Sequence, residues 1–555
     1  MNAPTAYSPA RLDPSIDLDL SKNEGRPPNE PLLSAVLNEA TVVGRYPDLA
    51  PLRRRIAAEL GVEPDRVLVT AGGDDALFRC FLARVGPGRR AVATTPSFEM
   101  ISRYAEQVGG GLTEIDWWNG PYPVHSVVSA LGERDVLFVV SPNNPTGAVI
   151  TESDLRLLSE RAALVVLDTA YIEFADDDLT GAALQLDNVV IIRTLSKAWG
   201  LAGLRVGYLL GPPDLVAEIG AYGSPYPVSG LSASLATTRL DAGDQMTAFV
   251  EDVKRERTAL VEILETRSIE AYPSQANFVL ARFDEADWVA SAAAALGVGL
   301  RRFPGRGPLE DHLRMTLPGD DRRFKRLVHA LLSALDPQAL LFDLDGVLCD
   351  VSASQTKAIV QTAAGFGVEV TASDVQRAKA AGNASDDWEL TRRLCAEADV
   401  EAAAGEIEDR FESLYQGSDG RNGLKDNESL LVERSLLSRW AGRLPLGVVT
   451  GRPRTDAEEF LRRFGLEELM SVVVTRDDAP LKPDPGPVRL ALSRLGVERA
   501  WMFGDTPDDI AASRKAAVVP VGVIAPGDDP AMAKEALAGS ARIVSELRAL
   551  EGLLP

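Results

Sequence analysis

The sequence predicts an α/β protein built from mostly parallel sheets, and three observations lead to this fold class. Short apolar runs rich in Val, Ile and Leu alternate with amphipathic helical patterns over almost the whole chain. Polar residues follow many of these runs, where ligands meet the carboxyl ends of parallel strands. From about 351 to 440 the pattern becomes helical, acidic and Ala-rich, which predicts a helical insertion.

Seven apolar runs are the clearest expected strands. They are "RVLVT" (66–70), "DVLFVV" (135–140), "ALVVLD" (163–168), "NVVIIRTLS" (188–196), "ALLFDLD" (339–345), "LGVVTG" (446–451) and "AWMFGD" (500–505). Between the fourth and fifth runs, a helical pattern ends at Leu335 and Pro337 prevents its continuation. We therefore expect a short linker at 336–340 between two separate halves.

Length, charge and cysteine content narrow the class of protein. A chain of 555 residues is too long for one ordinary core, and about 150 residues per domain suggests two to four domains. The formal net charge of −23 argues against nucleic acid or an anionic membrane as a partner. Three cysteines without zinc-site spacing predict neither a disulfide framework nor a structural metal. With no apolar segment suited to a signal peptide or a membrane span, we expect a cytoplasmic protein.

The stretch "TLSKAWGLAGLRVGY" (194–208) is the strongest chemical motif of the first half. It places Lys197 at a strand end, next to Ser196 and eight residues before Arg205. Such an amine can form a Schiff base with an aldehyde cofactor, while the hydroxyl and the guanidinium hold the cofactor phosphate. An exposed lysine in front of a helix is the alternative that this motif alone leaves open.

Other strand ends carry groups that suit the same cofactor. Asp168 ends an apolar run, which leads its carboxylate inward, where an unpaired charge is costly. A protonated pyridine nitrogen would pair with that charge and make the ring an electron sink. Asn144 and Tyr171 offer hydrogen bonds to the ring oxygen. The glycines of "TAGGDDAL" (70–77) begin an expected helix whose free N–H groups favour a phosphate.

With these motifs in order, residues 1 to about 335 resemble the fold-type I aminotransferases, specifically the histidinol-phosphate aminotransferase group. The resemblance implies pyridoxal 5'-phosphate as cofactor, a large domain at about 40–240, and a small domain from the N-terminal segment plus about 245–335. It implies Lys197 as the Schiff-base lysine and proton carrier, and a homodimer in which Tyr46 reaches the partner's site. The implied cofactor contacts are Tyr46, Gly72, Gly73, Asp74, Phe98, Asn144, Asp168, Tyr171, Thr194, Ser196, Lys197 and Arg205.

The same resemblance implies the substrate contacts. Arg314 of "HLRMTLP" would hold a substrate carboxylate or phosphate, and Arg301 and Tyr7 match positions that contact a substrate phosphate. Asn23 is a further expected contact. The sequence departs from the family pattern with "NEG" (23–25) and "PG" (318–319), and both departures leave the substrate open.

A second set of motifs predicts a phosphate-transfer site. "LLFDLDGVL" places Asp343 and Asp345 on one side of a strand end, and Gly346 permits a sharp turn. Two such carboxylates repel each other unless a cation or a proton lies between them. Later strand ends and loops add a hydroxyl, an amine and two carboxylates, which are Thr450 of "VVTGRP", Lys482 of "LKPDP", and Asp505 and Asp509 of "MFGDTPDDI". Carboxylates and phosphate oxygens are ligands that Mg²⁺ prefers.

These four motifs resemble the haloacid-dehalogenase superfamily of phosphatases over 339 to about 548. The resemblance implies a Rossmann-like core at 341–350 and 441–555, with the stretch 351–440 as a helical cap. It implies Asp343 as nucleophile, Asp345 as general acid and base, and Thr450 and Lys482 as contacts of the phosphoryl group. The implied Mg²⁺ ligands are Asp343, Asp345, Asp505 and Asp509.

Together the halves predict a bifunctional enzyme acting on a small phosphorylated molecule and glutamate. It would transfer an amino group to imidazole-acetol phosphate and dephosphorylate the resulting L-histidinol phosphate. Two alternatives stay open: the same chemistries on another phosphorylated amine or amino acid, or one half acting only as a regulatory or dimerising module.

Overall fold

The computed structural model describes residues 15–29, 34, 44–418 and 421–554, and its chain forms two compact units. The first unit contains 19–286 and 300–325, and the second contains 287–299 and 326 onward. The predicted division at 336–340 stays a prediction, because this clustering assigns the end of the first half to the second unit. None of the described helices is long and apolar enough to cross a membrane.

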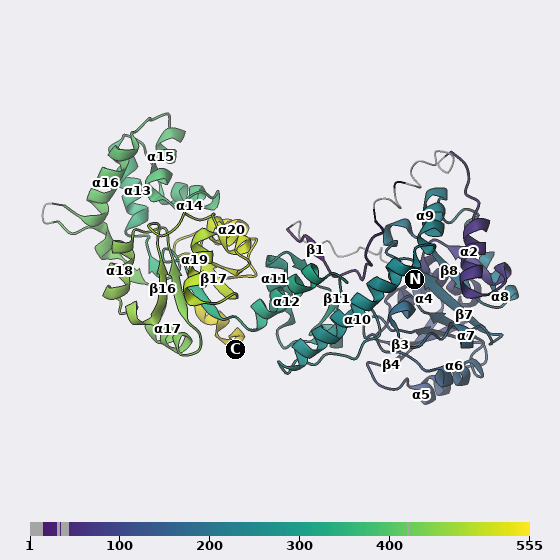
Figure 1. Cartoon of the computed structure of the whole chain (residues 1–555). Helices are drawn as coiled ribbons and strands as arrows, with labels where there is room; N and C mark the ends of the chain where they lie inside the picture. Colours follow the sequence, from purple (N-terminus) through teal and green to yellow (C-terminus); the bar gives the residue numbers. More distant parts are fainter. Residues whose placement is uncertain (1–14, 30–33, 35–43, 419–420, 555) are drawn as a thin grey trace. The chain divides into compact units, whose positions relative to one another are not determined.

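The first unit is built on a seven-stranded sheet with helices packed on it (Figure 1). Across the sheet, the strands run in the order β2 (Val67–Thr70), β8 (Gly207–Leu210), β7 (Val189–Thr194), β6 (Leu164–Asp168), β5 (Val136–Val140), β3 (Arg90–Thr95) and β4 (Gly111–Asp116). All four strands expected in this half are confirmed. Leu164 and Val166 enter one buried cluster while Val165 and Leu167 enter another, so both faces of β6 are covered.

One strand of this sheet departs from the expected parallel arrangement. β8 runs antiparallel to both β2 and β7. Between β7 and β8 the chain forms only turns and one short 3-10 helix, so it returns directly beside β7 instead of crossing over. Arg205 takes part in this return with a left-handed backbone angle φ of 52°. The turn therefore brings Arg205 back toward Ser196 at the end of β7.

The remaining elements of the first half surround this sheet or form a smaller layer. The helices are α2 (Ala50–Leu60), α3 (Gly73–Arg84), α4 (Met100–Gln107), α5 (Val124–Ala130), α6 (Glu152–Ser159), α7 (Thr180–Ala183), α8 (Pro213–Gly220), α9 (Gly230–Leu240) and α10 (Gly243–Glu265). Helix α11 (Ala286–Ala295) belongs, from Asp287 onward, to the second unit. Two short strands, β1 (Leu18–Asp19) and β10 (Val298–Gly299), pair with each other. β9 (Phe278–Arg282) pairs antiparallel with β11 (His312–Thr316), and this ladder carries Arg314 opposite Leu280.

Glu256 of α10 anchors the turn that follows β11. Its carboxylate accepts hydrogen bonds from the backbone N–H groups of Gly319 and Asp320, at 2.8 and 2.7 Å. A Cβ at Gly319 would lie 2.4 Å from the Phe249 ring, so this departure from the family pattern has a packing reason. Burial raises the pKa of Glu256 to about 7, although the two N–H groups oppose that shift.

The raised pKa of Glu256 makes stability depend on pH. Because the folded state holds this proton more tightly than the unfolded state, stability is lost as pH rises from about 4.5 to about 7. We expect the unfolding temperature of Glu256→Gln, relative to the wild type, to be higher at pH 8 than at pH 5. Glu262→Gln, on the exposed face of the same helix, is the control and should show no such trend. A constant difference between Glu256→Gln and the wild type would contradict this interpretation.

The second unit contains a six-stranded sheet in which every strand pair is parallel. The strand order is β16 (Met470–Val474), β15 (Leu446–Val449), β12 (Ala339–Phe342), β17 (Ala500–Gly504), β18 (Val519–Val523) and β19 (Arg542–Val544). The three strands expected in this half are confirmed. Helices α12 (Asp321–Leu335), α17 (Arg434–Ala441), α18 (Arg454–Arg463), α19 (Gly486–Leu495), α20 (Pro507–Lys515) and α21 (Pro530–Ala536) accompany the sheet.

The link between the halves is short and tied to the second sheet. α12 ends at Leu335, as expected from Pro337, and β12 begins four residues later at Ala339. Gln338 donates its N–H to the carbonyl of Arg499, and the Arg499 guanidinium contacts Asp336 at 3.1 Å. The indole of Trp501 in β17 donates to the carbonyl of Ser333 at 2.7 Å. These bonds hold the link against the strand that leads to Asp505.

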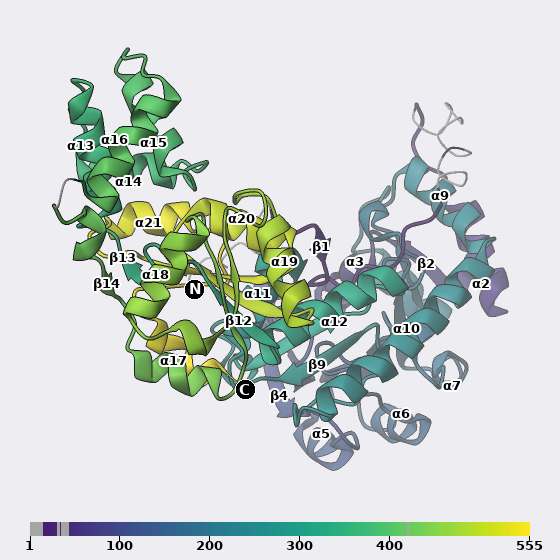
Figure 2. The same cartoon turned by 60° about the vertical axis from the view of Figure 1, so that its left-hand side comes forward.

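The insertion between β12 and β15 is helical, as expected. It contains α13 (Gln355–Gly365), α14 (Ala372–Ala380), α15 (Asp387–Glu397) and α16 (Ala404–Gln416), which lie together beside one end of the six-stranded sheet (Figure 1; Figure 2). The chain enters and leaves it through β13 (Cys349–Asp350) and β14 (Ser429–Leu430), a short antiparallel pair. The insertion has its own core, which includes Ile359, Leu390 and Phe411. It therefore forms a cap joined to the sheet by a two-stranded hinge.

Candidate active sites

The first candidate site is a cavity at the carboxyl ends of β5, β6 and β7. The cavity is lined by most of the predicted residues, namely Asn23, Gly73, Asp74, Phe98, Asn144, Asp168, Tyr171, Thr194, Ser196, Lys197, Arg205, Arg301 and Arg314. Gly72 lies just behind this wall, at the N-cap of α3. Tyr7 lies outside the described residues.

One end of this cavity is suited to a phosphate. The Thr194 hydroxyl donates to Ser196 Oγ at 2.9 Å, and an Arg205 nitrogen lies 3.5 Å from the same oxygen. Arg205 also donates to Asp74 at 2.9 Å. A Cβ at Gly72, whose φ is 83°, would lie 2.7 Å from the Arg205 guanidinium. Only glycine lets the arginine pack beside the N-terminus of α3, where N–H groups favour an anion.

Asp168 lies deeper in the same cavity, and its side chain is the best test of the expected cofactor. Its carboxylate accepts a hydrogen bond from the N–H of Ala170 at 3.1 Å. Burial raises the pKa of Asp168 to about 7, and the nearby charge of Lys197 only partly offsets this effect. A protonated ring nitrogen would satisfy this carboxylate, so the donor set fits pyridoxal 5'-phosphate.

Lys197 is held close to two groups expected at the cofactor ring. Its Nζ donates to the carbonyl of Lys22 at 3.4 Å and lies 5.6 Å from the centre of the Tyr171 ring. The Tyr171 hydroxyl accepts a hydrogen bond from Asn23 Nδ2 at 3.1 Å. Asn144 accepts one from Arg314 at 2.5 Å, which ties the expected ring contact to the expected carboxylate contact. Tyr46 is 81% exposed and stacks on Tyr226 with ring centres 4.6 Å apart.

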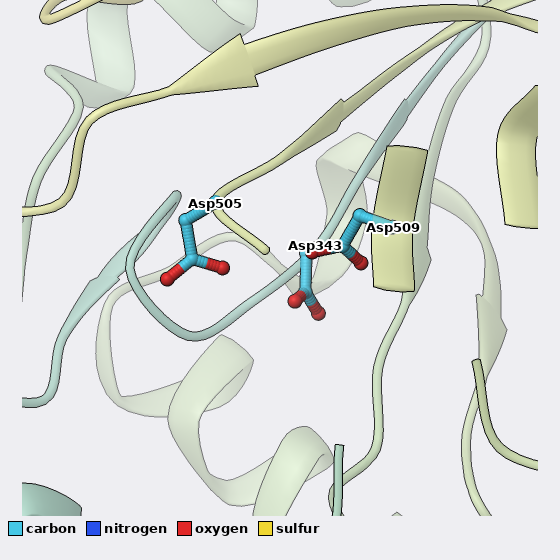
Figure 3. Close-up of side chains that lie close together, drawn as sticks. All are labelled: Asp343, Asp505 and Asp509. Carbon is cyan, nitrogen blue, oxygen red and sulfur yellow. The ribbon is translucent and has the colours of Figure 1, made fainter. Parts of the chain in front are cut away.

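The second candidate site lies at the carboxyl ends of β12 and β17. Asp343 follows β12, Asp505 follows β17 and Asp509 lies in the first turn of α20, and one oxygen of each lies within 4.8 Å of the others (Figure 3). Lys482 contacts Asp343 at 3.0 Å and Asp509 at 2.5 Å. Burial raises the pKa of Asp343 and of Asp505, and neighbouring carboxylates add to this effect. A divalent cation would relieve this repulsion, so the donor set fits Mg²⁺.

One glycine and two threonines shape the backbone around this cluster. Gly346, with φ of 73°, leaves no room for a side chain, because a Cβ would lie 2.1 Å from an Asp505 oxygen. Thr506 caps α20 and fixes Asp509 through a hydrogen bond of 2.6 Å from its hydroxyl. Thr450 directly follows β15, and its hydroxyl oxygen accepts the N–H of Arg452 at 3.2 Å.

The sequence predicts Asp345 as a fourth Mg²⁺ ligand, but among the described residues the acidic cluster contains only Asp343, Asp505 and Asp509. The Asp345 carboxylate accepts hydrogen bonds from Arg452 at 2.8 and 2.5 Å and from Gln355 at 3.1 Å. Burial raises the pKa of Asp345, but Arg452 outweighs that effect, and the pKa lies below its ordinary value. The side chain points to the guanidinium because residue 345 lies beyond the strand, where the alternation of a strand no longer applies.

Arg452 also connects Asp345 to the hinge of the cap. It donates to Glu428 at 2.9 and 3.1 Å, and Glu428 accepts further bonds from Tyr415 at 2.8 Å and Ser354 at 3.1 Å. Both ionic side chains of the Arg452–Glu428 pair are at most 4% exposed. Arg452 was visible in the quoted "VVTGRP" motif, whereas nothing in the sequence pattern distinguishes Glu428.

Arg452→Met should destabilise the second unit strongly. It leaves Glu428 buried without its cation, a change that costs about 3–5 kcal/mol in comparable cases. We expect a lower unfolding temperature for the calorimetric transition of this unit, and partial recovery in Arg452→Met/Glu428→Gln. Arg439→Met, which removes a half-exposed contact to Glu551, is the control and should cost less than about 1 kcal/mol. Equal effects of the two arginine variants would refute a structural role of the buried pair.

The cap completes the wall of the second site with residues that sequence patterns did not single out. Lys379 of α14, Asp387 and Trp388 of α15 and Tyr415 of α16 line the cavity at Asp343. Arg476, in the loop after β16 of the core, lines it as well. Burial raises the pKa of Asp387 to about 6, with Lys379 opposing the shift. Asp508, beside the cluster, accepts the N–H groups of Asn383 and Ala384 at 2.9 and 2.8 Å. These bonds join the loop between α14 and α15 to the first turn of α20.

Comparison with known families shows the family of each half. The model of the aminotransferase class I and II family matches residues 19–331. The chain belongs to the class I and II aminotransferases. The model of the haloacid dehalogenase-like hydrolases matches residues 337–517, so the aminotransferase half is fused to a hydrolase of that type.

Curated relatives of the chain carry related names. A histidinol-phosphate aminotransferase of Caldanaerobacter subterraneus is 34% identical over 301 residues, which cover 53% of this chain and 85% of that protein. A Phytophthora nicotianae protein named imidazoleglycerol-phosphate dehydratase is 47% identical over 197 residues, 34% of this chain. The chain spans only 44% of the length of that relative.

A solved structure supports the fold of the aminotransferase half. The histidinol-phosphate aminotransferase of Sinorhizobium meliloti, solved with pyridoxal 5'-phosphate, is superimposed with a TM-score of 0.52. It is 24% identical, and the match covers 57% of this chain and 90% of that one. The predicted fold class, a fold-type I aminotransferase followed by a haloacid-dehalogenase-type domain, is therefore confirmed.

Proposed function

We propose that this protein is a bifunctional enzyme that performs two consecutive reactions on one phosphorylated molecule. It transfers an amino group from glutamate to imidazole-acetol phosphate and then hydrolyses the product, L-histidinol phosphate, to L-histidinol. The observation that carries this proposal is the presence, in one chain, of an aminotransferase cavity lined by four arginines and an aspartate–lysine site suited to phosphate. The names of the two relatives, both of which refer to imidazole compounds or their phosphates, support this substrate class.

The aminotransferase half binds and orients its reactants through the residues described above. Pyridoxal 5'-phosphate, when bound, supplies an electron sink for the α-carbon of the amino substrate. Thr194, Ser196 and Arg205 bind its phosphate, and Asp168 keeps its ring nitrogen protonated. Lys197 Nζ takes the α-proton and returns it on the way to the product. Arg314 binds the carboxylate of glutamate through its planar fork.

The hydrolase half performs a two-step displacement at phosphorus. An oxygen of Asp343 attacks the phosphate monoester, while Asp345, which must first be released from Arg452 and protonated, gives its proton to the leaving alcohol oxygen. Asp345 then takes a proton from water, which hydrolyses the phosphoryl group on Asp343. Lys482 and Thr450 orient the phosphoryl oxygens. Mg²⁺, when bound by Asp343, Asp505 and Asp509, supplies positive charge that offsets the charge of the phosphate.

A homodimer through the aminotransferase half is part of this proposal. Tyr46 presents an 81% exposed ring, which we assign to the active site of a partner subunit. Light scattering on the purified protein tests the dimer directly. The three cysteines are buried and unpaired, which supports a reducing compartment such as the cytoplasm.

A coupled assay tests the two reactions. Purified protein with pyridoxal 5'-phosphate, Mg²⁺, glutamate and imidazole-acetol phosphate should form 2-oxoglutarate, inorganic phosphate and L-histidinol. L-histidinol phosphate alone should release phosphate. The absence of both amino transfer and phosphate release would refute the proposal.

A second candidate keeps both chemistries but changes the substrate to another phosphorylated amine or amino acid. The departures at Gly25 and at Pro318 and Gly319 favour it, because they adjoin Asn23 and the strand of Arg314. A panel of phosphorylated amines separates the two candidates, since the true substrate should be used efficiently by both halves.

A further inference from the structure

The wall of the aminotransferase cavity contains two charged residues that the proposed reaction does not use. Glu99 and Arg306 line it together with Arg301, Arg314 and Phe98. Glu99 directly precedes α4, and Arg306 lies in the loop between β10 and β11. Both belong to the first unit.

The arginines on this wall fall into two groups. Arg301 and Arg314 are backbone partners, since each donates its N–H to the carbonyl of the other at 3.0 Å. Cross-strand partners project from the same face, and like charges in that arrangement repel. Arg314 is held by Asn144 and by the carbonyl of Ser21 at 2.7 Å. Arg301 turns instead to Glu99, with a nitrogen 3.7 Å from its carboxylate.

Glu99 binds Arg306 as well. The Arg306 guanidinium donates to the second oxygen of the Glu99 carboxylate in a direct ion pair. The side chain of Glu99 is only 16% exposed, whereas that of Arg306 is 43% exposed. One enclosed carboxylate thus satisfies two guanidinium groups that face the cavity.

This arrangement resembles an anion-binding site in which the Glu99 carboxylate occupies the place of the anion. Two guanidinium groups carry two positive charges, and Glu99 neutralises one of them. A phosphate monoester carries a charge of about −1.5 to −2 at neutral pH and presents three oxygens. It can therefore replace Glu99 as the hydrogen-bond partner of both guanidinium groups. When the phosphate leaves, Glu99 can pair with the arginines again, which limits the cost of release.

Arg301 is already the expected contact of the substrate phosphate; we propose that Arg306 joins it in that subsite and that Glu99 is the internal counter-ion of the two arginines, displaced by the phosphate. The proposal rests on the proposed function, in which the aminotransferase substrate is a phosphate monoester. Glu99 thereby sets the affinity for phosphorylated substrates: it weakens their binding and speeds the release of the product that the hydrolase half needs.

Binding experiments on the full-length enzyme test this assignment. The enzyme is loaded with pyridoxal 5'-phosphate and carries Asp343→Asn, so that phosphate ligands are not consumed. The conversion of the cofactor by glutamate is followed by absorbance in single turnovers. Inorganic phosphate and L-histidinol phosphate are the probes, the first as competitor of glutamate and the second as amino donor.

Glu99→Gln should tighten the binding of both probes about fivefold, the range of a partly exposed ion pair. It should also lower the steady-state turnover number of amino transfer from L-histidinol phosphate to 2-oxoglutarate together with its KM, because release becomes slower. Arg306→Gln should weaken the binding of both probes by a similar factor. In Glu99→Gln/Arg306→Gln the effect of the first change should largely vanish, since the two side chains act on each other. Glu106→Gln, an exposed position on the same helix, is the control and should change neither constant.

A weaker affinity for inorganic phosphate in Glu99→Gln would overturn the proposal. It would show that Glu99 holds the arginines in position for phosphate instead of competing with phosphate for them. Additive effects in the double variant would overturn it as well. If L-histidinol phosphate does not react with the parent enzyme but inorganic phosphate binds tighter in Glu99→Gln, the substrate assignment fails and the counter-ion assignment stands.

Discussion

Asp343→Asn is expected to reduce phosphate release by about four orders of magnitude, since loss of a nucleophile removes most of the catalysis that its site provides. The amide cannot attack phosphorus, yet it retains the size of the carboxylate and can still contact Lys482. Amino transfer should be unchanged, because Asp343 takes no part in the aminotransferase cavity. Initial rates of phosphate release and of 2-oxoglutarate formation, measured on the same preparation, check both statements.

Asp399→Asn is a matched control for this substitution. Asp399 is exposed and adopts φ of 58°, a conformation that asparagine accepts as readily as aspartate. Both activities of this variant should equal those of the wild type. If Asp343→Asn leaves phosphate release at the wild-type rate, Asp343 is not the nucleophile. If phosphate release is at background in the wild type too and only amino-transfer kinetics respond to Asp343→Asn, the hydrolase half is a regulatory module.

Lys197→Ala is expected to reduce amino transfer by roughly a thousandfold or more, because removal of a positioned proton carrier alone costs about 10²–10⁴ in rate and the cofactor attachment is lost too. Borohydride treatment should fix the cofactor covalently to the wild type but not to this variant, as measured by the mass of the denatured protein. Phosphate release from L-histidinol phosphate should remain at the wild-type rate.

Lys325→Ala serves as the control for the lysine substitution. Lys325 lies on the exposed side of α12 and pairs with Asp321 at 2.7 Å. Its removal should leave both activities and the covalent fixation unchanged. Retention of the cofactor mass in Lys197→Ala would show that another amine holds the cofactor and would refute the assignment of Lys197.

Strand positions were predictable because a strand that is buried on both faces consists of consecutive apolar residues, which are visible in the sequence. β5, β6 and β7 in the first unit, and β12, β15 and β17 in the second, all lie inside the expected runs. β4 lies at the sheet edge with alternating partial exposure, and its sequence "GLTEID" carries no continuous apolar run. Exposure on one face therefore removes the signal that makes a central strand recognisable.

The same contrast applies to the candidate sites. Asp168, Lys197, Asp343 and Asp505 stand directly after apolar runs, and parallel strands bring such positions to one edge of a sheet. The cap residues Lys379 and Asp387 could not be selected in this way. They belong to helices in which many charged residues occur, and only the packing of those helices decides which charges face the cavity.

By itself, the sequence determined the α/β class, the two halves, the helical insertion and the residues that end the seven expected strands, because all of these depend on neighbours close in the chain. The tertiary structure decided the ion pairs that assign charges to partners. Arg452 meets Asp345 across 107 residues and Arg306 meets Glu99 across 207. A charged side chain in a low-dielectric cavity pairs with the nearest opposite charge. The local sequence does not show which distant residue the fold places beside it.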